Sequence, residues 1–301
     1  MFFERASARL LFLCVLPAAA ALCAQTSFAP REQAGQDGKD SLLDRAIDNV
    51  KKSEADSDLY ERIERVESRK NAGDANPAEV KYFRVDPMGM GLHRIALGPE
   101  GKPQDAAAYR GEVQELARTL EWATQNGRDQ KEAREKYAKR KKDRLELIEA
   151  TRTAFLFTWI ADEPRQERML AKYRMDPNPA YKPTSRSTSI LSKIHGFVWV
   201  DKASAQLARV EADVTADISI AGFLVKVYKG SHFMQERYEV QPGVWLPSFT
   251  QYDFEGRKFI IGFGVHEKAF AAHYRRIGPP EEALPLIRAE LDKPAPASGD
   301  R

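Results

Sequence analysis

Cysteine is scarce in this chain: among its 301 residues there are only two, Cys14 and Cys23. A scaffold held together by several disulfide bonds is therefore excluded. No apolar run reaches the roughly 20 residues that a helix needs to cross a bilayer, so we do not expect an integral membrane protein. The 47 basic and 44 acidic residues leave a formal net charge of only +3, which favours neither nucleic acid nor an acidic membrane as partner of the whole chain.

Sequence motifs of the common enzyme classes are also missing. The chain has no G-x-S-x-G elbow, no phosphate-binding loop and no dinucleotide fingerprint. Its histidines show no paired metal spacing such as H-E-x-x-H. These histidines are His93, His195, His232, His266 and His273. The sequence therefore predicts neither a metal nor a cofactor, and we expect a protein that is not an enzyme.

The first 24 residues have the three parts of a secretory signal peptide: a basic start, an apolar middle and an exit of small residues. The middle is Leu10–Cys23, and we expect cleavage after Ala24, because Leu22 and Ala24 fit the positions that the peptidase reads. Lipid anchoring through Cys23 is the less favoured alternative, because a lipoprotein signal places a small residue where Leu22 stands. We therefore expect export to the periplasm, with residues 25–40 as a flexible linker.

Two helical regions follow. Apolar residues recur at helical spacing over 42–50 and predict a short amphipathic helix. A second region covers 104–150, and unbroken it would be about 70 Å long at the helical rise of about 1.5 Å per residue. We therefore expect a break at Gly127. Beyond it, Arg128–Glu146 is almost entirely charged, and we interpret its basic residues 139–142 as a solvated helix face.

From Thr153 onward the hydrophobic period changes to two, most clearly over 208–216, which indicates strands. Tight turn signals separate successive strands, including Glu255-Gly256 before the last one, and favour an antiparallel meander. Residues 279–301 are expected to form a C-terminal tail with a short helix near its start. The predicted strands are 59–69, 79–86, 90–97, 154–161, 167–175, 194–201, 208–216, 223–228, 232–240, 244–254 and 257–276.

Some of these strands are apolar on both faces, as in 154–160 and 194–201. An antiparallel sheet that is open to water should show one polar face, so two apolar faces need two covers. Helices could supply one cover, and curvature around an apolar cavity could supply the other. A core packed on both faces is the alternative. The candidate cavity-wall residues are Phe155, Phe157, Trp159, Phe197 and Trp199.

The run Gly196-Phe-Val-Trp-Val-Asp-Lys202 resembles the G-x-V-W-[IV]-D strand and turn of LolA/LolB-like proteins. A wider stretch, from about Ala154 to Ile277, resembles bacterial outer membrane lipoprotein-sorting proteins. The matching pieces are Asp176-Pro-Asn-Pro-Ala-Tyr-Lys-Pro183, Ser185-Arg186, Val225-Lys-Val-Tyr-Lys-Gly230 and Val244-Trp-Leu-Pro247.

This resemblance implies an α+β fold, in which a curved antiparallel sheet of about eleven strands forms an unclosed barrel with helices over its concave face. Residues 41–278 would be a single domain with a charged helical insertion near 104–150. It further implies a non-catalytic carrier that holds an acyl chain of a lipid or lipoprotein in the concavity. The alternative is a periplasmic protein-binding or envelope-stress sensory module with an envelope protein partner. Neither the carrier nor the sensory module implies binding to nucleic acid. Both are compatible with peripheral contact with a membrane.

Overall fold

The computed structural model of the chain describes residues 42–220 and 225–293. These residues form two compact units. The first unit combines residues 42–52, 144–238 and 252–265 without 221–224, and the second combines 53–143, 239–251 and 266–293. The predicted signal peptide and the linker at 25–40 lie outside the described residues.

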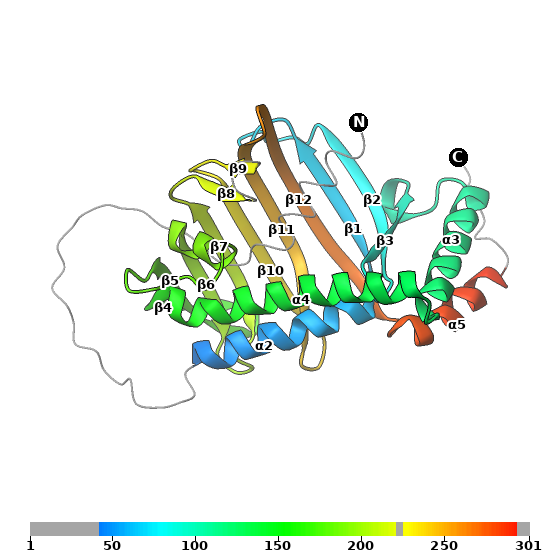
Figure 1. Cartoon of the computed structure of the whole chain (residues 1–301), viewed down its shortest axis with the longest axis horizontal. Coiled ribbons are helices and arrows are strands. Elements are labelled where there is room, and N and C mark those ends of the chain that lie inside the picture. The colour runs from blue at the N-terminus through cyan, green and yellow to red at the C-terminus, as the bar shows by residue number, and fades with distance from the viewer. Residues whose placement is uncertain (1–41, 221–224, 294–301) are drawn as a thin grey trace. The chain divides into compact units, whose positions relative to one another are not determined.

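The strands form one antiparallel sheet, whose order is β3-β2-β1-β12-β11-β10-β7-β6-β5-β4, with β9 beside β11 and β8 beside β9 (Figure 1). The end strands β3 and β4 do not pair with each other among the described residues, so the sheet is not closed into a barrel. This confirms the predicted α+β fold. The strands are β1 (Tyr60–Arg69), β2 (Glu79–Pro87), β3 (Leu92–Leu97), β4 (Phe155–Arg165), β5 (Arg168–Pro177), β6 (Ile194–Asp201), β7 (Leu207–Val214), β8 (Ile218–Ile220), β9 (Val225–Val227), β10 (His232–Gln241), β11 (Val244–Lys258) and β12 (Ile261–Arg276).

The helices follow the predicted pattern. The amphipathic segment forms α2, and the long helical region is divided as expected, because α3 ends before Gln125 and α4 starts after Gly127. At the start of α3, Oδ1 of Asp105 accepts hydrogen bonds from the backbone N of Ala107 and Ala108, at 2.8 and 3.1 Å. The helices are α2 (Leu42–Asp56), α3 (Ala106–Thr124), α4 (Arg128–Ala154) and α5 (Pro280–Leu291), with 3₁₀ turns η1 (Ser57–Leu59), η2 (Pro99–Gly101) and η3 (Thr188–Lys193).

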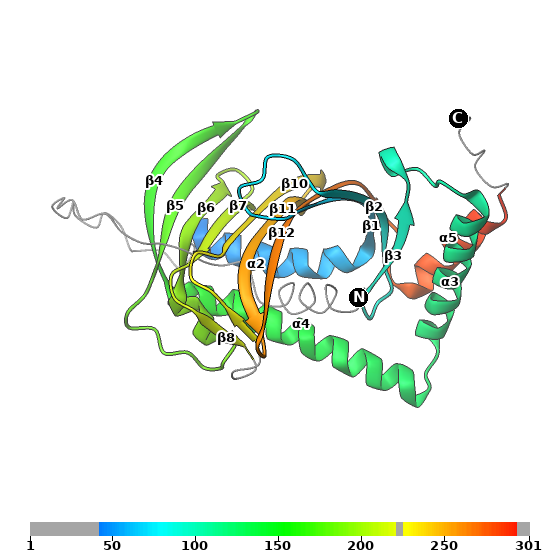
Figure 2. The ribbon, with the colours of Figure 1, turned by 90° about the horizontal axis from the view of Figure 1, so that it is seen from above.

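The first unit has its core on one face of strands β4 to β7, which succeed one another in chain order (Figure 2). In a strand, alternate side chains point to opposite faces, so the register decides which residues meet. Val198 on β6 lies opposite Tyr173 on β5 and Val210 on β7. Val198 and Val210 belong to a buried cluster with Leu147 of α4, while Tyr173 and Leu43 of α2 pack against it. Two helices therefore cover this face within the first unit.

The second unit has a separate core between α3, α5 and β3. The largest of its fully buried side chains are Ile95, Leu116, Leu120, Ile277 and Ile287. The charged first half of α4 also belongs to this unit. One of its basic residues, Lys141, forms an ion pair with Asp58 at 2.7 Å.

Two strand predictions are wrong in detail. The three-residue strand β8 was not predicted, because so short a segment carries no readable period. The turn expected at Glu255-Gly256 is also misplaced, since β11 continues to Lys258 and the chain turns at Phe259-Ile260. Gly256 serves close strand approach instead: an added Cβ would strike the backbone oxygen of Lys226 and the ring of Phe263.

Candidate functional site

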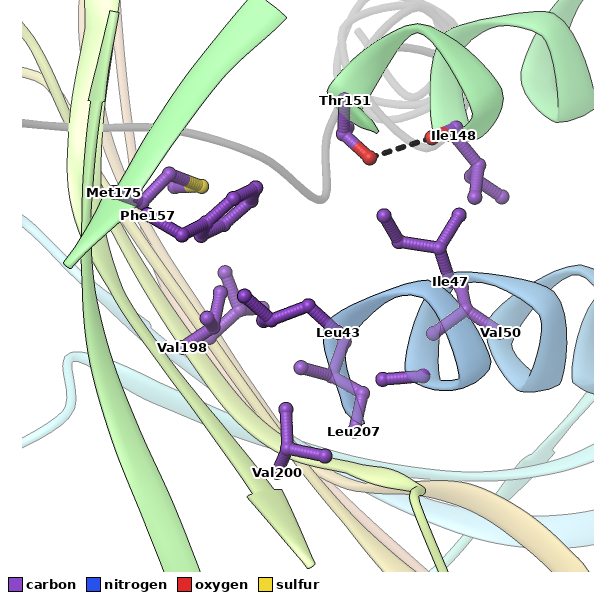
Figure 3. A pocket seen from close by; sticks show the side chains of 12 residues that line it. Leu43, Ile47, Val50, Ile148, Thr151, Phe157, Met175, Val198, Val200 and Leu207 are labelled. Carbon is purple, nitrogen blue, oxygen red and sulfur yellow. Dashed lines mark hydrogen bonds between the residues drawn. The ribbon is translucent and has the colours of Figure 1, made fainter. Parts of the chain in front are cut away.

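A small pocket of about 60 Å³ lies within the first unit, between the covered face of the sheet and the two helices (Figure 3). Every residue that lines it belongs to this unit. The lining residues are Leu43, Ala46, Ile47 and Val50 from α2, Ile148 and Thr151 from α4, Phe157 from β4, Met175 from β5, Val198 and Val200 from β6, and Leu207 and Val210 from β7.

Strand alternation explains why the sheet side of the pocket is apolar. Phe157 lies opposite Met175 across the β4–β5 pair. On the next pair, Val200 of β6 lies opposite Leu207 of β7. Because residues that face each other across a ladder point to the same side of the sheet, these apolar side chains gather on one face.

The helix side of the pocket comes mainly from α2. Leu43, Ala46, Ile47 and Val50 are spaced three or four residues apart, so they form one stripe along the helix. Figure 3 shows Leu43 reaching from α2 toward Val198 of the sheet, while Ile47 lies between α2 and Ile148 of α4. The apolar stripe of α2 is therefore the roof of the pocket.

The pocket offers no free polar group. Its one polar lining residue, Thr151, uses its hydroxyl to donate a hydrogen bond to the backbone oxygen of Ile148 at 2.6 Å. None of the twelve lining residues is titratable. General acid–base or nucleophilic chemistry needs a side chain that can hold a proton or attack, so these walls can bind an apolar group but cannot transform it.

Polar contacts at its margins hold α2 in place. The guanidinium of Arg152 on α4 forms ion pairs with Asp44 and Asp48 of α2, at 2.6 and 2.5 Å. Lys51 of α2 reaches Glu149 of α4 at 2.9 Å. These pairs are partly or largely exposed, and such pairs typically contribute no more than about 1 kcal/mol each. The roof is therefore attached by weak surface contacts around an apolar centre.

The structure divides the five predicted wall residues between the two faces of the sheet. Phe157 lines the pocket, and Phe155 lies in the adjoining core with its ring centroid 6.1 Å from that of Phe157. Trp159 lies opposite Tyr173 on the same face, yet its side chain is 57% exposed. Its indole N–H donates to Oδ1 of Asp162 at 3.2 Å.

Phe197 and Trp199 lie on the opposite face from the pocket, since Val198 between them points into it. The ammonium of Lys172 lies 4.8 Å from the Trp199 ring centroid, and the guanidinium of Arg209 lies 4.9 Å from it. The indole N–H of Trp199 donates to Glu163 at 2.7 Å and is the main cause that lowers the pKa of that carboxyl. Cations therefore cover these rings, as in cation–π contacts.

Sequence reasoning named only Phe157 among the twelve lining residues. The apolar stripe of α2 was visible as helical spacing over 42–50, and Val210 was visible in the alternating strand. Joining these two patterns across one pocket would have identified five of the twelve lining residues. The aromatic residues stood out instead, although half of the wall consists of valine, leucine and isoleucine side chains from other segments.

The second unit contains a buried group of charged side chains, which we call the Arg84 cluster. The guanidinium of Arg84 forms ion pairs with Glu61, Asp86 and Glu290, at 3.0, 3.0 and 2.7 Å. It also donates to the hydroxyl of Tyr109 at 2.8 Å. Through these contacts one side chain of β2 ties together β1, α3 and α5.

This cluster makes stability depend on pH. Burial raises the pKa of Asp86 to about 7, with Arg84 opposing the rise and Glu61 adding to it. An unfolded aspartate has a pKa near 3.9, so between about pH 4 and 7 the folded state holds a proton that the unfolded state has lost. The free energy of unfolding should therefore fall as pH rises from about 4 to about 7 and level off above that. Asp86→Asn should flatten this fall in urea unfolding at about pH 5.5 and about pH 8.5; an unchanged slope would contradict the assignment.

Among residues 42–220 and 225–293 there is no group of three or more histidine, cysteine or acidic side chains that could hold a metal ion. A search of the same residues for a helix long and apolar enough to span a bilayer also finds none.

No model of a known protein family matches the chain, and comparison with curated proteins finds no match either. Comparison with solved structures finds a crystal structure from Vibrio parahaemolyticus, described as an outer membrane lipoprotein-sorting protein domain. The identity is 10%, and the match covers 82% of this chain and 99% of that chain with a TM-score of 0.32.

Proposed function

We propose that the protein is an exported, non-catalytic carrier that shelters an acyl chain of a lipid or lipoprotein in the pocket of the first unit. The observation that supports this most strongly is the chemistry of the pocket: its walls are apolar, and its one hydroxyl is already bonded. Such walls select hydrocarbon over any polar ligand, because a buried polar group without a partner is strongly disfavoured.

The size of the pocket requires α2 to move when a chain binds. A volume of about 60 Å³ corresponds to about two water molecules, whereas pockets for small molecules have about 300–1,000 Å³. Full exposure of four apolar side chains of α2 would cost several kcal/mol, which is about what ten acyl methylenes gain at roughly 0.8 kcal/mol each. We therefore expect α2 to shift and keep covering the chain rather than to leave the sheet.

The location and the partner follow from the sequence. The N-terminal 24 residues have the pattern of a secretory signal peptide, which supports a periplasmic protein. The motif at 196–202 resembles LolA/LolB-like proteins, and the stretch from about 154 to 277 resembles lipoprotein-sorting proteins, which supports a lipoprotein acyl chain as cargo.

Titration of the protein with a dansylated fatty acid tests this function. We expect saturable binding with a blue shift of the dansyl emission, because the probe leaves water for an apolar site. Competition by unlabelled palmitate should reverse the shift. If the probe does not bind while the protein from its own host is found with a protein partner, the sensory alternative replaces the carrier.

Arg152→Gln should speed the uptake of the same probe by about two- to tenfold, because it removes the ion pairs that hold α2 to α4. Stopped-flow fluorescence measures the association rate. Arg45→Gln is the matched control, since Arg45 is an exposed arginine of α2 itself. An unchanged rate in Arg152→Gln would mean that α2 is not the moving part.

A further inference from the structure

The hairpin of β11 and β12 is seen in Figure 1. Its turn carries three large exposed apolar residues, Phe259, Ile260 and Ile261, which we call the apolar tip. The side chains of Phe259, Ile260 and Ile261 are 52%, 92% and 66% exposed. Turns are normally built from glycine, proline, asparagine, aspartate and serine. The hydrophobic effect disfavours exposure of these three side chains to water. Folding alone therefore does not explain them, and exposed apolar side chains of this kind mark sites of interaction.

The backbone conformation at the apolar tip is also unfavourable for the residue that stands there. Phe259 has φ of 56°, in the left-handed region that glycine and asparagine adopt most readily. A bulky aromatic residue is disfavoured there. Neither local conformation nor burial therefore favours phenylalanine at this position.

Basic residues stand directly behind the apolar tip. Arg257 and Lys258 precede it, and the guanidinium of Arg257 donates to the backbone oxygen of Phe259 at 2.7 Å. Across the ladder Arg257 lies opposite Lys226, which forms an ion pair with Asp217 at 2.7 Å. Placing two cations opposite each other in a sheet is unfavourable unless an anion joins them.

The nearby carboxylates do not neutralise the two basic residues Arg257 and Lys258. Asp217 is engaged by Lys226, and its pKa is lowered chiefly by that hydrogen bond. The next acidic residue along β11 is Glu255, which precedes Arg257 by two positions. The end of the hairpin therefore offers apolar side chains first and two cations, Arg257 and Lys258, immediately behind them.

We propose that the apolar tip inserts into the interface of a bilayer that contains anionic lipids, with Arg257 and Lys258 at the phosphate groups. Apolar side chains at the boundary of headgroup and acyl chains, backed by cations, are the arrangement by which peripheral proteins bind such membranes. The charge complementarity favours an anionic lipid surface as the occupant. All these residues belong to the first unit, and the proposal goes beyond the carrier function and does not depend on it.

Vesicle binding tests the proposal with a chain that starts at Gln25. This chain keeps every described element and omits the apolar segment Leu10–Cys23, which would itself bind lipid. We expect it to co-sediment with vesicles of phosphatidylethanolamine and phosphatidylglycerol. The double variant Phe259→Asn, Ile260→Ser should bind at least about tenfold more weakly, because two buried apolar anchors are lost.

The control variants separate membrane contact from general effects. Leu156→Ser removes an apolar side chain that is as exposed as Phe259, and it should bind like the wild type. The double variant should unfold at the same temperature as the wild type or higher, because asparagine accepts the left-handed backbone. Lys258→Gln should weaken binding about fivefold, and only on anionic vesicles.

A label at the tip locates the contact. The chain from Gln25 contains no cysteine, so Ile260→Cys gives a single attachment point for an environment-sensitive dye. Its emission should shift to the blue on anionic vesicles, whereas a dye on Leu156→Cys should not respond. Absence of binding by the unmodified chain, or equal binding by the double variant, would overturn the proposal. Uptake of the dansylated fatty acid by the double variant reports the carrier function separately.

Discussion

Phe157→Asp should reduce the affinity for the dansylated fatty acid at least about tenfold, because it places a carboxylate among the apolar walls of the pocket. An acyl chain gives this charge no hydrogen-bond partner, and water in the pocket would compete with the chain. The affinity is measured by fluorescence titration, together with circular dichroism to show that the sheet remains.

The neighbouring residue provides the control for this experiment. Thr158 is exposed and, by strand alternation, points to the opposite face from Phe157. Thr158→Asp adds the same charge one position away and should leave the affinity unchanged. Equal losses in the two variants would show that charge on β4, and not the pocket wall, controls binding.

Arg84→Leu should lower the free energy of unfolding by about 3–5 kcal/mol, the usual range when one partner of a buried ion pair is removed. The substitution leaves Glu61, Asp86 and Glu290 facing one another without the cation that each of them contacts. Urea unfolding near neutral pH measures the loss, and acid should reduce it as carboxylates become protonated.

An exposed arginine of the same unit is the matched control. Arg118 on α3 contacts Glu115 at 3.0 Å at the surface, and Arg118→Leu should change the free energy of unfolding by less than about 1 kcal/mol. A similar small effect of Arg84→Leu would mean that the Arg84 cluster does not hold α3 and α5 to β2.

The sequence predicted most of the elements because local patterns determine them. The helical spacing over 42–50, the glycine at the break before α4 and the alternation in β7 all reappear in the structure. The misplaced turn has a physical reason: Gly256 reads as a turn residue, but close contact with Lys226 and Phe263 places it within a strand.

The site was harder to predict than the fold. Segments 154–160 and 194–201 are apolar on both faces, so composition does not tell which face a given aromatic residue joins. That choice depends on register across β5, β6 and β7, which is set by contacts between distant parts of the chain. Phe157 and Trp199 therefore read alike in the sequence, although they lie on opposite faces. The apolar residues of α2 could be recognised as a helix face, but not as the roof of a pocket.

Native mass spectrometry of the protein, purified from the periplasm of its own host without detergent, tests the carrier function most directly. We expect a population whose mass exceeds that of the bare chain by one acylated molecule, and this excess should be lost in Phe157→Asp. A bare mass for the whole sample, or a complex with a protein partner and no lipid, would contradict the carrier function.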